Sequence, residues 1–333
     1  MAARQGLLGK SFALAAEAYS DAVGGSMSAD SLRRITEGWG EQVREQREEE
    51  ARRANAPAQK GETPNQRRVT AVEPIRGQAN LSTDGGMVRV RDEEWKEVKL
   101  TVVSEVEVRP AAEGEVTGGD EERGEDPLVS LKGHSYQAGL WDADTMALYQ
   151  YAEGVRRGVD ACQRLSSVND GAPWIERITD LNFPGVIQIV DWCHAVEKLW
   201  KVGQAVYGEG TEEGKAWVKE QQERLWQGKV GEVETALEQL GLDQEHWPDE
   251  VRQAPGYFAK NRKRMRYADF RAKGLPIGSG TVESGIKTVV HHRLKRPGRG
   301  WKRTNAQAML AGLSELHSGR FDRAWQATLP LAA

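Results

Sequence analysis

The chain has 333 residues, 38% of them hydrophobic, and its 46 basic and 50 acidic residues give a formal charge of −4, which allows one large domain or two to three smaller ones. No apolar run approaches the roughly 18 residues of a membrane span, and Glu17 interrupts the apolar stretch after Lys10, which argues against a secretory signal. With only Cys162 and Cys193, a disulfide framework and a four-cysteine zinc site are excluded, and we expect a cytoplasmic protein.

The first part of the chain, residues 1–53, is predicted to be helical. A first helix over about 11–23 ends at Gly24, and a second begins after Ser28, which is a good N-cap residue. Two helices joined by a short glycine turn fit either half of a DNA-binding helix-turn-helix or an ordinary helical hairpin. One face of the second helix is apolar, with Leu32, Ile35, Trp39 and Val43 at helical spacing.

A proline-containing polar linker over 54–80 is predicted to precede a β-hairpin. Residues 87–91 alternate between apolar and polar, and residues 95–108 continue with β-type residues after a short acidic turn. Residues 105–127 carry nine acidic and two basic residues, which predicts an acidic loop. A further strand is expected at 129–138.

The second half of the chain is predicted to be mostly helical. We expect a helix from about Asp144 to Arg164, followed by a short buried parallel strand at 186–190. From Ala195 onward, Leu and Trp recur at helical spacing. Residues 256–325 then predict a helix, a glycine-rich loop and a long helix.

A strongly basic segment is hidden by the nearly neutral total charge. From Lys260 to Arg303 there are 14 Lys or Arg and only two acids, Asp269 and Glu283, which leaves −16 for the rest of the chain. Such a segment favours binding to a polyanion such as DNA. The alternative is a solvated basic face that the acidic loop neutralises.

Three carboxylates lie in unusual settings. Asp84 and Asp170 are each followed by glycine, and Glu283 lies where a glycine-rich turn opens a helix. Taken singly, an Asp-Gly pair is most often only a turn. Three acids that converged from separate segments would repel one another unless cations neutralised them. A pair of Mg²⁺ ions would suit that need and could support cleavage of a phosphodiester.

The residues of two long segments are similar to one known family. The strings DGAPWIERITDLNFPGVIQIVDWCHAVEKLW (170–200) and YFAKNRKRMRYADFRAKGLPIGSGTVESGIK (257–287) resemble bacterial insertion-sequence transposases of the ISKra type. These are DDE transposases related to the Mutator group. STDGG (82–86) and WKEVKL (95–100) resemble the family's first catalytic strand and hairpin. The resemblance covers about 80–325.

The resemblance implies a fold and a set of catalytic residues. It implies an α/β fold with an RNase H-like catalytic domain over 81–325, interrupted by an all-helical insertion at about 197–255. Asp84 would lie on the first strand, Asp170 at the end of the fourth, and Glu283 on the helix after the insertion. These three residues would be catalytic and would bind Mg²⁺ or Mn²⁺, two ions in all. Supporting residues are expected at Asp191 and His194, although a lone His at a helix start is more often structural.

The implied activity is metal-dependent DNA strand cleavage and strand transfer at insertion-sequence ends. The expected partners are element ends and target DNA, with the protein forming a homo-oligomer in the DNA complex and no membrane involved. The alternative is a catalytically inactive or truncated transposase-derived DNA-binding protein, and a two-carboxylate glycosidase leaves the basic segment without a role. The residues expected to contact DNA are Arg262, Lys263, Arg264, Arg266, Lys287, Arg293, Lys295, Arg296 and Trp301.

Overall fold

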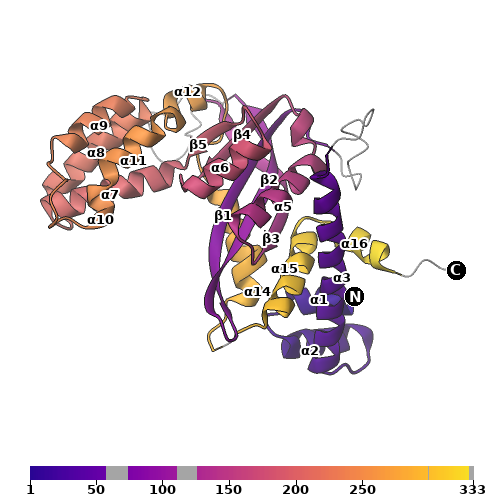
Figure 1. Ribbon diagram of the computed structural model, residues 1–333. Coiled ribbons are helices and arrows are strands. Elements are labelled where there is room, and N and C mark those ends of the chain that lie inside the picture. The colour runs from indigo at the N-terminus through magenta and orange to yellow at the C-terminus, as the bar shows by residue number, and fades with distance from the viewer. Residues whose placement is uncertain (58–73, 111–125, 299, 330–333) are drawn as a thin grey trace.

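The centre of the molecule is a five-stranded mixed sheet covered by helices. The computed structural model describes residues 1–57, 74–110, 126–298 and 300–329 (Figure 1). In the sheet order β3-β2-β1-β4-β5, β2 is antiparallel to both of its neighbours, whereas β4 and β5 run parallel to β1. The fold is therefore α/β. The strands are β1 (Gln78–Val90), β2 (Glu94–Arg109), β3 (Leu128–Gly139), β4 (Arg164–Asn169) and β5 (Ile187–Val190).

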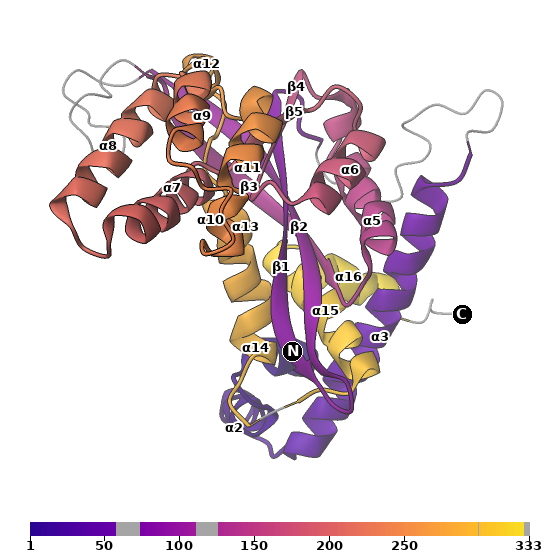
Figure 2. The ribbon, with the colours of Figure 1, turned by 60° about the vertical axis from the view of Figure 1, so that its left-hand side comes forward.

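The helices form two groups (Figures 1 and 2). The N-terminal and C-terminal helices pack along the sheet, whereas the helices that follow β5 project away as a lobe. The first group comprises α1 (Ala2–Leu8), α2 (Phe12–Val23), α3 (Ala29–Ala54), α5 (Ala143–Arg156), α6 (Pro173–Asn182), α15 (Arg303–His317) and α16 (Phe321–Thr328). The lobe comprises α7 (Trp192–Tyr207), α8 (Glu212–Trp226), α9 (Val230–Glu238), α10 (Asp249–Arg252) and α11 (Ala254–Asn261).

Shorter helices connect the lobe back to the sheet. A 3₁₀ turn at Arg262–Arg264 precedes α12 (Tyr267–Ala272). The chain then passes through α13 (Gly280–Gly285), a π-helical turn at Ile286–His291 and α14 (His292–Leu294). Among the helices that the structure describes, none is both long and apolar enough to cross a membrane.

The predicted β-hairpin and third strand are present in the structure, but several predicted element boundaries are wrong. β1 begins at Gln78, inside the expected linker, and β2 continues to Arg109, inside the expected acidic loop. At this end of β2, Val106 and Val108 pair with residues of β3. Charged residues alternate with them, so the sequence there predicts a loop. The helix expected to reach Arg164 ends at Arg156. Residues 58–73 of the linker and 111–125 of the loop lie outside the described residues.

The predicted boundaries of the N-terminal helices are confirmed. α2 ends at Gly24, whose positive φ of 68° suits glycine, and the Ser28 hydroxyl accepts the Ser31 N–H at 3.1 Å at the start of α3. These helices are not a separate packing unit, because Leu7 and Trp39 belong to the hydrophobic core that also contains strand and α15 side chains. A helix-turn-helix function for them stays a prediction.

The expected all-helical segment at about 197–255 is confirmed, and it directly follows β5. α7 and α8 pack closely at Gly203, where a Cβ would lie 2.6 Å from a Val218 methyl carbon. The lobe therefore has a close-packed core of its own that continues to the end of the sheet. The apolar residues of this core are fully buried and include Leu199, Val218, Leu225, Val233, Leu237 and Phe258.

Candidate active site

Asp84 lies in the middle of β1, where this strand separates from β4. The parallel pairing of β1 with β4 ends at Asn80 and Ser166. Further along, the Asn169 side-chain oxygen accepts the Thr83 N–H at 2.7 Å and bridges the two strands. Asp84 is half-buried, and its Oδ1 accepts the Gly85 N–H at 2.7 Å. Asp84 therefore lies on β1 just beyond the part of this strand that is joined to β4.

Asp170 follows β4 directly and is held by its own loop and by the helical lobe. Its Oδ1 accepts the Ala172 N–H at 2.8 Å. From α11, the Tyr257 hydroxyl donates to the Asp170 carbonyl at 3.1 Å. Gly171 has a φ of 87°, and a Cβ there would lie 3.1 Å from the Tyr257 oxygen. Glycine is therefore required for the chain to turn beneath this tyrosine.

Glu283 lies in α13, and the loop before this helix is anchored to the end of β5. The Ser279 hydroxyl donates to the Glu283 carboxylate at 3.3 Å, and the Ser279 N–H donates to Asp191. The Trp192 N–H donates to the Ile277 carbonyl at 2.9 Å. The glycine-rich turn thus delivers Glu283 to the same end of the sheet as Asp170.

The electrostatics of Asp84 show that the three carboxylates interact. The pKa of Asp84 is raised to about 6, mainly by burial and in smaller part by the charges of Asp170 and Glu283. The hydrogen bond from Gly85 and the charge of His194 oppose this rise. The structure therefore brings together Asp84, Asp170, Glu283 and His194 from four separate segments.

Asp191 and His194 form a pair beside these carboxylates. Asp191 is 1% exposed, caps α7, and accepts the His194 N–H at 2.8 Å. Burial by itself would raise the pKa of Asp191, but hydrogen bonds from His194 and Ser279 outweigh it and lower the pKa. The hydrogen bond to Asp191 raises the pKa of His194, and the charges of Asp170 and Glu283 add to this effect.

The carboxylates suit a divalent cation by their chemistry, although they do not form a closed ligand set. In the described part of the chain, no three His, Cys, Asp or Glu side chains are already gathered around one ion position. The hydrogen bonds to Asp84 and Asp170 each occupy Oδ1, so Oδ2 of each remains for a ligand. Carboxylate oxygens are preferred ligands of Mg²⁺. The pKa of Asp84 is raised first by burial and then by the charges of Asp170 and Glu283, and a cation would relieve this second contribution.

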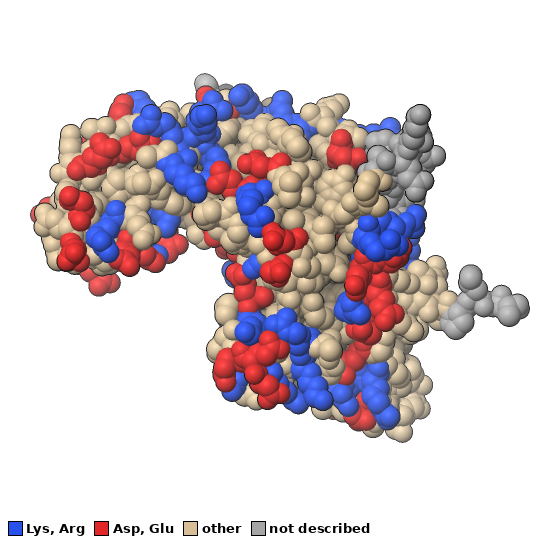
Figure 3. Space-filling model, viewed as in Figure 1, with Lys and Arg blue, Asp and Glu red and all other residues tan. Residues whose placement is uncertain are grey.

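The basic segment is partly neutralised by local ion pairs. Arg262 pairs with Glu234, and Arg264, whose side chain is 12% exposed, pairs with Glu176 at 3.0 Å. Arg266 lies 3.6 Å from Asp269. Basic and acidic side chains are interspersed over the face of the molecule that Figure 3 shows. Of the residues expected to contact DNA, three lysines are exposed and form no ion pair among the described residues: Lys263, Lys287 and Lys295.

Arg293 and Trp301 do not occupy the exposed positions expected of DNA contacts. Arg293 is 1% exposed, donates to the Gly6 carbonyl at 3.2 Å, and stacks over Phe12 at 4.2 Å. The Trp301 indole is half-buried and donates to the Leu294 carbonyl at 3.2 Å. The prediction of a surface role for Arg293 is wrong, because this side chain joins the N-terminal segment to α14. Arg296 is half-buried and donates to the His292 carbonyl.

Sequence reasoning missed Tyr257 and Ser279. Tyr257 lies in the helical lobe, 87 residues after Asp170, and no pattern singles it out from the other tyrosines. Ser279 stands inside the glycine-rich string that precedes Glu283, so its position was a usable signal. Both residues orient a segment that carries a catalytic candidate.

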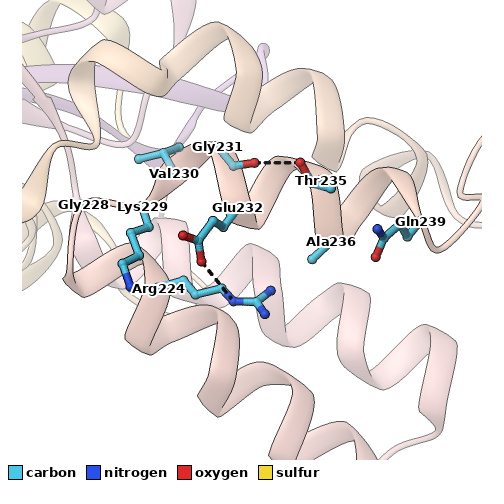
Figure 4. Close-up of a pocket in the computed structure, with 9 residues that line it drawn as sticks. All are labelled: Arg224, Gly228, Lys229, Val230, Gly231, Glu232, Thr235, Ala236 and Gln239. Carbon is cyan, nitrogen blue, oxygen red and sulfur yellow. Dashed lines mark hydrogen bonds and ion pairs between the residues drawn. The ribbon is translucent and has the colours of Figure 1, made fainter.

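A cavity of about 590 Å³ between α8 and α9 lies within the lobe (Figure 4). Two pairs of its lining residues interact with one another: Arg224 lies 3.6 Å from Glu232, and the Thr235 hydroxyl donates to the Gly231 carbonyl at 3.0 Å. The cavity contains none of the candidate residues. No protein-family model and no curated protein sequence matches the chain.

Proposed function

We propose that this chain is a DDE transposase that cleaves DNA and transfers strands at the ends of an insertion sequence. The observation that carries the proposal is that the charges of Asp170 and Glu283 both act on Asp84. These acids come from a strand, a strand end and a helix that are far apart in the sequence. Among the described residues none of the three acids pairs with an arginine, and like charges without such partners are typical of a site that requires cations.

The topology supports an RNase H-like catalytic domain. Three antiparallel strands followed by two parallel ones, in the order β3-β2-β1-β4-β5, is the arrangement that such a domain requires. The helical lobe lies between β5 and the helix of Glu283, where the resemblance to ISKra-type transposases expects an insertion. Copies of the chain are expected to associate on the DNA.

The residues of the site would have three roles: metal binding, positioning of His194, and binding of DNA phosphates. Asp84, Asp170 and Glu283 would bind two Mg²⁺ or Mn²⁺ ions, which activate a water or 3′-hydroxyl and stabilise the leaving oxygen when bound. With a pKa of about 6, Asp84 is mostly ionised at neutral pH and available as a ligand. Asp191 fixes the His194 ring beside the carboxylates. Lys263, Lys287 and Lys295 would bind backbone phosphates, which positions DNA without selecting its sequence.

A cleavage assay tests the proposal. The substrate is a duplex that contains the DNA flanking the gene, incubated with the full chain and Mg²⁺ or Mn²⁺. We expect a nick that leaves a 3′-hydroxyl. The variants Asp84→Asn, Asp170→Asn and Glu283→Gln should each reduce cleavage to background while DNA affinity stays within about twofold. Lys219→Ala, an exposed change in the lobe, is the control.

Two outcomes would contradict this proposal. Cleavage that persists near the wild-type rate in one variant would remove that residue from the site. DNA binding by the wild-type chain without any cleavage would favour the alternative, a transposase-derived DNA-binding protein without activity.

A further inference from the structure

A second cavity lies at the end of the molecule opposite the helical lobe. Its volume is about 810 Å³, and it is lined by residues of α2, α3, α14, the hairpin turn after β1 and the beginning of α15. The described residues that line it include four cations and one carboxylate, Glu37. The cations are Arg33, Arg91, Arg293 and Lys302.

The charges of this cavity are only partly balanced. Arg33 is neutralised, because it pairs with Glu37 at 3.0 Å and with Asp30 at 2.5 Å. Arg91 and Lys302 are exposed and have no ion pair among the described residues. With Arg293 in the wall, the lining carries an excess of positive charge, which favours an anion.

The walls of the cavity are fixed before any ligand arrives. The Arg91 N–H donates to the Trp301 carbonyl at 2.8 Å, and its Nε donates to the Gly300 carbonyl at 2.8 Å. Arg293 lies over the rings of both Phe12 and Trp301, at 4.2 and 5.2 Å. A preorganised cation costs less entropy to engage than one on a mobile chain.

The beginning of α15 adds to this potential. Lys302 occupies the N-cap position and no side chain caps the helix there, while Thr304 and Asn305 of its first turn line the cavity. The unpaired N–H groups and the dipole of a helix start favour negative charge. The cavity thus combines side-chain cations with a backbone donor surface.

We propose that this cavity binds a phosphate group. Arginine presents a planar fork that matches phosphate oxygens, and the two exposed cations, Arg91 and Lys302, come from the hairpin turn and the start of α15. The volume exceeds what one phosphate needs and falls in the range of sites for small organic ligands. The phosphate is therefore carried by a larger molecule, either a free nucleotide or a DNA strand. That the phosphate belongs to DNA depends on the proposed function, whereas the binding of a phosphate group does not.

Thermal unfolding of the full chain tests phosphate binding without any cleavage assay. At equal ionic strength, inorganic phosphate at about tenfold its Kd should raise Tm by about 2 °C relative to chloride. The double variant Arg91→Gln/Lys302→Gln should lose this rise, while Arg91→Lys, which keeps the charge, should retain most of it. Lys229→Gln removes one charge in the lobe and should behave as the wild type.

The proposal is overturned if phosphate gives no rise in Tm, or if Lys229→Gln loses as much of it as the double variant. Equal Tm values of all variants in chloride would rule out a merely structural effect. If Arg91→Lys also loses the rise, the guanidinium geometry rather than charge binds phosphate, which still supports the site.

Two probes separate the sources of the phosphate. For a DNA source, the double variant should weaken binding of a 20-base-pair duplex and reduce the slope of log K against log salt by about 0.9 for each phosphate that the variant no longer binds. For a nucleotide source, adenosine monophosphate should raise the Tm of the wild type but not of the double variant, with the duplex slope unchanged. The variant Asp84→Asn should keep its phosphate response, so a failure of the proposed catalysis leaves this test intact.

Discussion

Two groups of charged residues in this protein have opposite compositions. An ion-pair cluster joins α3, α5 and the α15–α16 turn, and its members alternate in sign from one contact to the next. At the candidate active site, the charges of Asp170 and Glu283 act on Asp84, as does that of His194. The ion-pair cluster consists of Arg47, Glu50, Glu153, Arg156, Glu315 and Arg320.

The same physical forces produce opposite pKa shifts in the two places. Burial would raise the pKa of Glu153, but Arg320, Arg156 and Arg47 overcome this and lower the pKa to about 2. The pKa of Asp84 is raised to about 6, mainly by burial and in smaller part by its carboxylate neighbours. The ion-pair cluster therefore stabilises the fold with balanced charge. The candidate site carries an excess of negative charge that a bound cation would reduce.

The largest expected difference is in stability after loss of one carboxylate. Glu153→Gln leaves buried arginines without their partner and should lower the free energy of unfolding by about 3–5 kcal/mol. Asp84→Asn removes a repelled charge and should leave this free energy unchanged or raise it by about 1 kcal/mol at pH 8. Urea unfolding followed by circular dichroism measures both. A large loss of stability in Asp84→Asn would mean that Asp84 is a structural residue.

The dependence of stability on pH should also differ in sign between the two groups. The pKa of Glu153 is lowered from 4.5 to about 2, so its stabilisation is present above pH 4.5 and is lost as pH falls toward 2. The pKa of Asp84 is raised from 3.8 to about 6, so its destabilisation grows as pH rises from 3.8 to 6. Urea unfolding of the wild type and of Asp84→Asn at several pH values should show the difference between them rising across this window.

Divalent cations should stabilise the protein through the carboxylates of the candidate active site and not through the ion-pair cluster. If Mg²⁺ or Mn²⁺ binds the folded site at tenfold its Kd, it should stabilise the wild type by about 1.4 kcal/mol at pH 8. At pH 5, where Asp84 is mostly protonated, the effect should shrink. Asp84→Asn should show little stabilisation at either pH. Equal stabilisation by the metal in wild type and variant would place its binding elsewhere.

The elements that the sequence predicted well are those with local signals. The hairpin and the boundaries at Gly24 and Ser28 follow from alternation, glycine and capping residues. The start of β1 at Gln78 could not be found in this way, because its pairing with β4 joins residues more than 80 positions apart.

The candidate site was predicted only in part for the same reason. Asp84, Asp170 and Glu283 were found through short strings around each residue. The burial of Arg293 depends on Gly6 and Phe12 at the other end of the chain, and a count of charges along the sequence does not contain that contact. The contact of Tyr257 with Asp170 is likewise tertiary.

Tyr257 connects the helical lobe to the site and gives a smaller expected effect. Tyr257→Phe removes the hydrogen bond to the Asp170 carbonyl and should lower the free energy of unfolding by about 0.5–1.5 kcal/mol. If Tyr257 positions the Asp170 loop, cleavage should fall several-fold and the Mg²⁺ concentration for half-maximal rate should rise. Tyr207→Phe in the same lobe is the matched control. A loss of stability without any change in Mg²⁺ dependence would make the contact structural only.

The smallest expected effect on stability belongs to Lys295, an exposed cation of the basic segment that lies 5.9 Å from the Trp95 ring. Lys295→Ala should change the free energy of unfolding by less than about 0.5 kcal/mol. If Lys295 binds a backbone phosphate, the slope of log K against log salt should shrink by about 0.9, equally for element ends and random duplex. Lys219→Ala should leave the slope unchanged. A slope unaffected by Lys295→Ala would instead indicate that this side chain belongs to a solvated surface, because only a phosphate contact releases counterions when it forms.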